Sequence, residues 1–167
     1  MKKVLIFSMI CLMGMATVCM MNSCNKDQTN KEGYVNLGLP SGTKWRASNE
    51  TNSNSGNEFF THDEAVAKFG SNLPTKKQFE ELQNSCKWKW KGSSYKVTGP
   101  NGSYIILPAS GYRYCGGDVY GVNSYGYYWS SSLGASDDAW SLLFTSSSVY
   151  MGSYDRCDAR SVRLVQK

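Results

Sequence analysis

The residue types that most often carry enzyme chemistry are scarce in this chain, and their spacing matches no common catalytic arrangement. His62 is the single histidine, and it stands beside Asp63 and Glu64 at the start of an expected helix. We therefore expect a surface position next to the helix cap and not the role of a general base. No GxSxG, GxGxxG or GxxxxGKS/T motif occurs. The sequence predicts no catalytic residue and no enzyme activity.

Cysteines are the second source of reactive or metal-binding groups. Cys86, Cys115 and Cys157 lie in the part of the chain that we expect to fold. An odd number in an oxidising compartment leaves at least one thiol unpaired, and the sequence does not choose among the three possible pairings. No CxxC or HxxxH spacing supports a zinc site. Cys115 or Cys157 as a reactive group remains the basis of an alternative enzyme hypothesis.

Acidic residues could bind calcium through oxygen ligands. Asp137 and Asp138 are adjacent, and Asp155 stands three residues before Asp158. Calcium prefers such ligands, but neighbouring acids in loops are usually only hydrated. We therefore predict no metal and no cofactor.

The N-terminus has the order of a secretory signal. Lys2 and Lys3 precede an apolar run over residues 4–21, and a serine then stands directly before Cys24. This junction resembles the lipobox of bacterial lipoproteins, in which the cysteine is lipidated after cleavage. The alternative is a transmembrane anchor, because a run of this length could just cross a bilayer. We expect an exported lipoprotein held at the outer membrane, on its periplasmic face or at the cell surface.

The expected organisation has three parts: a signal peptide over residues 1–23, lipidated Cys24 with a polar tether over 24–33, and one domain over 34–167. The net charge of +5 falls by two when the signal lysines leave. This balance does not favour a nucleic-acid partner.

The pattern along the domain predicts an α+β fold. Thr61 with Glu64, and Thr75 with Gln78, have the spacing of capping boxes and predict two early helices. The remainder predicts an antiparallel sheet. The expected strands are Tyr34–Leu37, Thr43–Ala47, a period-two segment from Lys87, Tyr95–Thr98, Ser103–Leu107, Tyr127–Ser131, Trp140–Phe144, Val149–Met151 and Ser161–Val165. The basic cluster around Lys87 and Lys89 is interpreted as a solvated face and a protected strand edge.

Composition changes in the C-terminal half. No Lys, Glu or His occurs between Val97 and Gln166, and the segment from Tyr112 to Arg160 is rich in Tyr, Ser, Gly and Asp. Antibody paratopes use a similar mixture, because tyrosine offers large contact area at small entropic cost. Trp129 and Trp140 are expected in the core, and Arg160 and Arg163 in the terminal strand. The candidate ligand contacts, on loops of this segment, are Tyr112, Tyr114, Tyr120, Tyr125, Tyr150, Tyr154, Asp155 and Arg156.

Four ordered segments carry a family resemblance. They are Gly38–Trp45, Leu73–Leu82, Tyr128–Ser132 and Ser161–Val165. Together they resemble the Fibrobacter succinogenes major paralogous domain family. The resemblance implies a C-type lectin-like fold, related to the formylglycine-generating enzyme fold, with the first and last strands paired. The Glu-Pro-Asn or Gln-Pro-Asp motif of true C-type lectins is missing, which argues against a lectin-type calcium site.

These observations lead to a functional expectation. We expect a non-catalytic, membrane-anchored module that binds a protein or glycan through its Tyr/Ser/Gly-rich C-terminal loops. The composition also resembles targets of diversity-generating retroelements, a hypothesis that requires an adjacent reverse transcriptase gene or a near-copy of this segment's DNA. Alternatives are a structural envelope or fimbria-associated lipoprotein, and an enzyme of the formylglycine-generating-enzyme-like fold.

Overall fold

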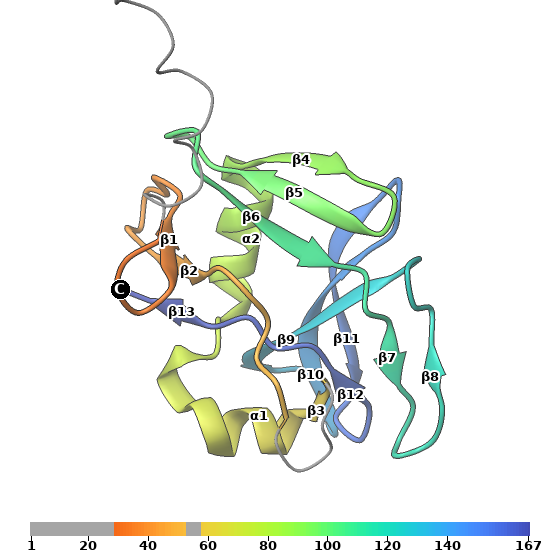
Figure 1. Cartoon of the computed structure of the whole chain (residues 1–167). Helices are drawn as coiled ribbons and strands as arrows, with labels where there is room; N and C mark the ends of the chain where they lie inside the picture. The colour runs from red at the N-terminus through yellow and green to blue at the C-terminus, as the bar shows by residue number, and fades with distance from the viewer. Residues whose placement is uncertain (1–28, 53–57) are drawn as a thin grey trace, which may run out of the picture.

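The computed structural model describes residues 29–52 and 58–167 and has a mixed α+β fold (Figure 1). The predicted signal peptide and Cys24 lie outside the described residues. Within the described ranges, no helix is long and apolar enough to cross a membrane. The elements in chain order are β1 (Tyr34–Asn36), β2 (Lys44–Arg46), β3 (Phe60–Thr61), α1 (His62–Phe69), the short 3-10 helix η1 (Gly70–Asn72), α2 (Lys76–Ser85), β4 (Lys87–Trp90), β5 (Ser94–Thr98), β6 (Tyr104–Pro108), β7 (Tyr112–Arg113), β8 (Val119–Tyr120), β9 (Gly126–Leu133), β10 (Asp138–Phe144), β11 (Val149–Asp155), β12 (Ala159–Arg160) and β13 (Val165–Gln166).

Both helices begin where the capping boxes predict. The Thr61 side chain accepts a hydrogen bond from the Glu64 amide, and the Glu64 carboxylate accepts one from the Thr61 amide at 2.8 Å. Thr75 and Gln78 repeat this arrangement at the start of α2. Each box satisfies amides that the first helical turn leaves unpaired, so the two helix starts are fixed by local chemistry.

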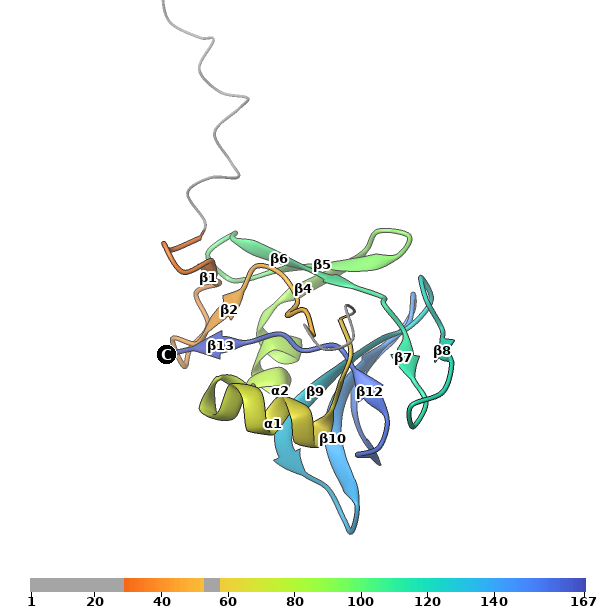
Figure 2. The ribbon, with the colours of Figure 1, turned by 60° about the horizontal axis from the view of Figure 1, so that its bottom comes forward.

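The strands form several small sheets, where the sequence predicted one. The strand orders are β1-β2-β13, β11-β10-β9, β3-β12-β7-β8 and β4-β5-β6, and all pairings within these sheets are antiparallel. Val165 in β13 pairs with Trp45 in β2, so the first and last strands share a sheet but are not the direct partners that the sequence predicted, because β2 lies between them. Figure 1 and Figure 2 place this sheet and the C-terminus on the opposite side of the molecule from the β7–β8 hairpin.

Two hydrophobic clusters hold the sheets and helices together. The larger cluster joins Trp45, Phe79 and Phe144 with residues of β5 and β6. The smaller cluster contains Phe60, Trp129 and Val162 and connects α1 to β9. Trp129 is fully buried, which confirms its predicted place in the core. Trp140 is only half-buried, with the Lys76 amino group 3.5 Å from its ring centre.

The predicted strand Ser161–Val165 is wrong in its extent. The segment leaves β12 at Arg160 and enters β13 only at Val165, and it is buried throughout. The backbone of this segment forms hydrogen bonds with different elements. Ser161 exchanges hydrogen bonds with β9, while the carbonyl of Leu164 accepts a hydrogen bond from the Arg46 amide. A regular ladder with one neighbour is therefore replaced by contacts with several elements.

Arg163 lies in this buried segment and has the structural role that the sequence predicted. Its guanidinium group donates to Asn49 Oδ1 at 3.0 Å and to the backbone carbonyls of Arg46 and Ile106 at 3.0 and 2.7 Å. These bonds connect the terminal segment to the loop after β2 and to β6. Because each of the three guanidinium nitrogens has a hydrogen-bond partner, the buried charge is well accommodated.

The segment from Tyr112 to Arg160 is also more regular than predicted. Tyr112 lies in β7, Tyr120 in β8 and Tyr154 in β11, so the expectation of loops is wrong for these three tyrosines, whereas Tyr150 lies in β11 where the strand Val149–Met151 was predicted. Their strands are very short or carry exposed tyrosines and serines, which weakens the apolar alternation by which strands are recognised. Pairing with distant strands supplies the missing stabilisation.

A candidate binding surface built from tyrosines

Six tyrosines from four strands and one turn form a connected aromatic face, here called the tyrosine surface. The ring centres of Tyr112 and Tyr127 are 4.8 Å apart, and Tyr127 is 5.9 Å from Tyr154. Tyr120 lies 6.0 Å from Tyr112, and Tyr125 lies 6.3 Å from Tyr127. Tyr150 joins the group through its hydroxyl contact with Tyr154. The members are Tyr112, Tyr120, Tyr125, Tyr127, Tyr150 and Tyr154.

Strand register places these rings on one face. Tyr112 and Tyr120 are direct cross-strand partners in the β7–β8 hairpin. Tyr150 and Tyr154 are four residues apart on β11, so period-two alternation directs both to the same side of the sheet. Gly152 lies between them, and a Cβ atom there would come within 2.6 Å of the Tyr154 ring. The glycine therefore makes room for the Tyr154 ring to lie along the strand.

Arg160 lies beneath the tyrosine surface and has 1% of its area exposed. Its guanidinium carbon is 4.1 Å from the ring centre of Tyr154, 4.7 Å from Tyr127 and 4.5 Å from Trp129. Its Nη2 donates to the Asp158 carboxylate at 2.9 Å, while Nε and Nη1 have no hydrogen-bond partner. The ring faces stabilise the cation electrostatically, so Arg160 holds the inner tyrosines in place.

The half-buried tyrosines remain neutral over a wide pH range. Burial raises the pKa of Tyr127, and burial together with the hydroxyl contact to Tyr150 raises the pKa of Tyr154 to about 12. Three other members are well exposed: Tyr120 at 50%, Tyr125 at 43% and Tyr150 at 45%. The surface thus presents uncharged rings and hydroxyl groups to a ligand.

A disulfide stands at the end of the β7–β8 hairpin. Cys115, in the hairpin turn, is bonded to Cys157 in the turn between β11 and β12. Of the three pairings that the sequence allowed, the structure has this one, and Cys86 is a free, half-buried thiol. The bond connects the two parts of the chain that carry Tyr112, Tyr120, Tyr150 and Tyr154.

The described residues contain one grouping of three potential metal ligands, and it includes this disulfide. Cys115, Cys157 and Asp158 place their ligand atoms within 4.8 Å of one another. Both sulfurs are engaged in the disulfide, so neither is the thiolate that a metal or a nucleophilic reaction requires. Asp158 is paired with Arg160. This chemistry fits a structural role better than the binding of a metal ion.

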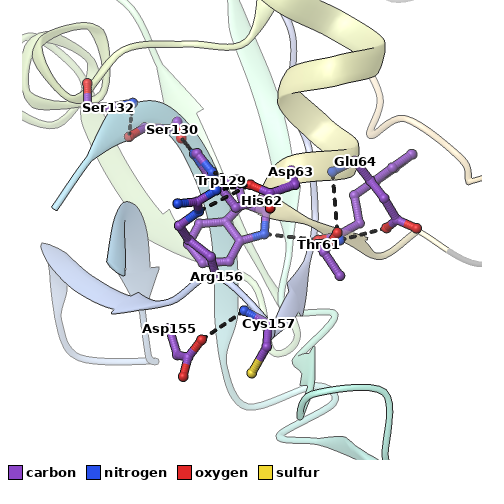
Figure 3. A network of polar contacts seen from close by, with 11 residues as sticks. Thr61, His62, Asp63, Glu64, Trp129, Ser130, Ser132, Asp155, Arg156 and Cys157 are labelled. Carbon is purple, nitrogen blue, oxygen red and sulfur yellow. Dashed lines mark hydrogen bonds and ion pairs between the residues drawn. The ribbon is translucent and has the colours of Figure 1, made fainter. Parts of the chain in front are cut away.

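A polar network fixes the β11–β12 turn to helix α1 (Figure 3). The Arg156 guanidinium forms an ion pair with Asp63, and its Nε donates to the carboxylate at 3.1 Å. This pairing holds the pKa of the Asp63 carboxyl below its usual range. The Asp155 carboxylate accepts a hydrogen bond from the Cys157 amide at 2.9 Å. Both proposed contacts, Asp155 and Arg156, therefore help to shape the turn beside the tyrosine surface.

His62 contradicts the expectation of a surface cap residue. It is 2% exposed, its Nε2 lies 3.0 Å from the Ser130 carbonyl, and its ring meets Trp129 edge to face. Burial lowers the pKa of the imidazole, so the neutral form is favoured. The acidic neighbours Asp63 and Glu64 suggested exposure, but the first turn of α1 turns this one side chain toward β9.

The structure brings five of the predicted contacts together and adds one. Tyr112, Tyr120, Tyr125, Tyr150 and Tyr154 join the tyrosine surface, whereas Tyr114 is exposed in the turn beside the disulfide and makes no ring contact in the described structure. Tyr127 lies in the predicted strand Tyr127–Ser131 and was not among the predicted contacts. Alternation explains the difference: Tyr128 is fully buried, and Tyr127 faces the opposite side.

Comparison with known proteins identifies the family. No curated protein and no solved structure matches the chain. One family model, described as a domain of unknown function (DUF8237), matches residues 80–165. The match covers more than half of the chain and includes every member of the tyrosine surface. The chain therefore belongs to the DUF8237 family.

Proposed function

We propose that this DUF8237 chain is a non-catalytic module that binds a protein or glycan ligand through its tyrosine surface. The observation that carries the proposal is that six tyrosines, from separate segments between Tyr112 and Tyr154, lie together on one connected face. Each ring offers flat apolar area and each hydroxyl offers a donor and an acceptor. These properties suit peptide side chains and the apolar faces of sugars.

Rigidity of the surface supports the same proposal. Arg160 contacts the rings of Tyr127 and Tyr154 from below, and the Cys115–Cys157 bond ties the hairpin to the β11–β12 turn. Side chains that are already ordered lose little conformational entropy when a ligand arrives. An array of this kind binds more tightly because the conformational entropy of its side chains is already lost when the protein folds, and little more is lost when the ligand binds.

The fold and anchor complete the proposal. We propose a C-type lectin-like domain, related to the Fibrobacter succinogenes major paralogous domain family and carried on the outer membrane by lipidated Cys24. The sheet in which the last strand β13 joins β1 and β2, and the two helices that precede the β9–β10–β11 sheet, support this assignment of the fold. The polar segment before β1 would act as the tether.

The test is a screen of the purified chain on glycan and protein arrays, with and without calcium. A ligand that is bound without calcium should be lost or weakened at least tenfold when Tyr120 and Tyr150 are both changed to alanine. Each substitution removes an exposed ring from the tyrosine surface without removing a core side chain. Binding by aromatic contacts accounts for losses of this size.

A matched control separates the surface from a general effect of losing a tyrosine. Tyr104 lies in β6 of a different sheet, beside Lys96, so Tyr104→Ala should leave ligand binding unchanged. Equal loss in the control and in the double variant would contradict the proposal. If the chain binds nothing on either array, the structural envelope or fimbria-associated alternative would be favoured instead.

A further inference from the structure

Strand β11 forms one edge of the β9–β10–β11 sheet. It is seven residues long, its register with β10 is continuous, and from Val149 to Tyr154 it carries no charge and no proline. In the described structure, no backbone hydrogen bond reaches its outer side, although Gln83 of α2 donates to the Val149 carbonyl at 2.6 Å. A strand edge of this kind presents unpaired amides and carbonyls that can pair with another strand.

The direction of the backbone groups follows from the β10–β11 turn. The Thr145 amide donates to the Ser148 carbonyl, so these two residues form a hydrogen-bonded pair at the turn. Hydrogen-bonded and non-bonded pairs alternate in an antiparallel ladder. Val149, Met151 and Ser153 therefore direct their amides and carbonyls away from β10. The position of the Val149 carbonyl, which is open to Gln83, agrees with this alternation.

The edge of another sheet is protected against the addition of a strand. Strand β4, at the edge of the β4–β5–β6 sheet, exposes Lys87 and Lys89. Lysines on an edge discourage the addition of a strand. The β11 edge is longer and has no such protection along Val149–Tyr154.

The sequence of β11 is nearly symmetric about Gly152. If a second copy pairs antiparallel to it around a twofold axis at this glycine, Met151 stands opposite Ser153 of the second copy, and Tyr150 opposite Tyr154. Met151 and Ser153, whose amides and carbonyls point away from β10, then form the hydrogen-bonded pairs that an antiparallel ladder requires. Gly152 faces itself at the axis, where the strands come closest and a side chain would crowd. Aromatic residues would meet in cross-strand pairs on both sides of the axis.

We propose that the chain forms a homodimer by antiparallel pairing of β11 with β11 of a second copy, centred on Gly152. The partner is a second copy and not an unrelated strand, because the order of residues around Gly152 is complementary to itself. A single twofold axis closes the assembly and joins the two sheets into one. Since Tyr150 and Tyr154 of both copies face the same side, the two tyrosine surfaces become neighbours.

The test changes one outward amide. Ser153→Pro removes the Ser153 amide, which faces away from β10, and proline is tolerated at such edge positions. Ser153→Ala is the matched control, because it loses the same hydroxyl and keeps the amide. The full chain, kept dissolved in mild detergent, is examined by sedimentation velocity over a wide range of concentrations. We expect a dimer for the native chain and for Ser153→Ala, and a monomer for Ser153→Pro.

Hydrogen–deuterium exchange provides a second readout that does not depend on a variant. In the native chain, the amides of Met151 and Ser153 should exchange more slowly as the protein concentration rises, while the exposed amides of the β7–β8 turn should not change. A native chain that stays monomeric at all concentrations would overturn the proposal. A Ser153→Pro variant that still forms a dimer would also overturn it. So would protection of the Met151 and Ser153 amides that is seen only after a ligand is added, because the edge would then pair with a strand of the ligand.

Discussion

The guanidinium carbon of Arg160 lies 4.1 Å from the centre of the Tyr154 ring, beneath a face that also carries the exposed rings of Tyr120, Tyr125 and Tyr150. This contact connects the interior to the candidate binding surface. Arg160 belongs to the short strand β12 and Tyr154 to the edge strand β11, so the contact also joins two sheets. Changes at Arg160 should therefore affect both the stability of the fold and the order of the tyrosines.

Replacing Arg160 with methionine should strongly destabilise the protein. The substitution keeps an apolar stem but leaves the Asp158 carboxylate, which is 7% exposed, without its cation. Breaking a buried pair in this way costs about 3 to 5 kcal/mol of unfolding free energy. Urea unfolding monitored by tryptophan fluorescence measures the loss. Adding Asp158→Asn should recover part of it, and an Arg160→Met protein as stable as the native one would contradict this role.

Removing the disulfide should also lower stability. The bond between Cys115 and Cys157 spans a sequence separation of 42 residues. Closing a loop of that length in the unfolded chain corresponds to about 4 kcal/mol of stabilisation in the chain-entropy model. The double variant Cys115→Ser/Cys157→Ser should show this loss in chemical unfolding, and mild reduction of the native protein should reproduce it.

The pairing itself can be checked directly. Trypsin cleaves after Arg113, Arg156 and Arg160, so Cys115 and Cys157 fall in different peptides. Without reduction, mass spectrometry should find these two peptides joined. Finding either of them joined to the peptide that contains Cys86 would refute the pairing.

Stability should decrease as the pH falls below about 6.5. Burial lowers the pKa of His62 from its ordinary value of 6.5. As the pH falls, His62 therefore takes up a proton in the unfolded chain before it does so in the folded chain. Its contribution to the free energy of unfolding is present above the pKa of the unfolded chain and is lost as the pH falls toward the pKa of the folded chain. Thermal unfolding between pH 7 and pH 5 measures this slope. Because His62 is the single histidine, His62→Gln should flatten it; an unchanged slope in the variant would assign the effect to other groups.

Cys86 should react slowly with thiol reagents in the folded protein. Burial, with a smaller contribution from the charge of Glu81, raises its pKa from 9.0 to about 11. Since the thiolate is the reactive form, the population available at a given pH falls about a hundredfold relative to the unfolded chain. Alkylation with iodoacetamide, followed on the peptide that holds Cys86, compares the native and denatured protein. Similar rates in the two states would contradict the buried position.

Features that depend on neighbouring residues could be predicted from the sequence. The spacing of Thr61 with Glu64 and of Thr75 with Gln78 located both helix starts, because a capping box uses only groups within one turn. The strands Tyr95–Thr98 and Ser103–Leu107 were predicted on either side of residues 99–102, and β5 and β6 pair there, because the Asn-Gly sequence between them favours the backbone conformations of tight turns. The concentration of tyrosines between Tyr112 and Arg160 also indicated where a binding surface could lie.

Tertiary structure alone decided which of these groups meet. Whether Tyr112 lies beside Tyr127, whether Cys115 bonds Cys157 and not Cys86, and whether His62 is buried all depend on contacts between segments far apart in the chain. A local pattern fixes the helix starts and the turns because their energies come from adjacent residues. The tyrosine surface, the disulfide and the buried Arg160 arise only when the sheets pack, because their energies come from burial and pairing across long sequence separations.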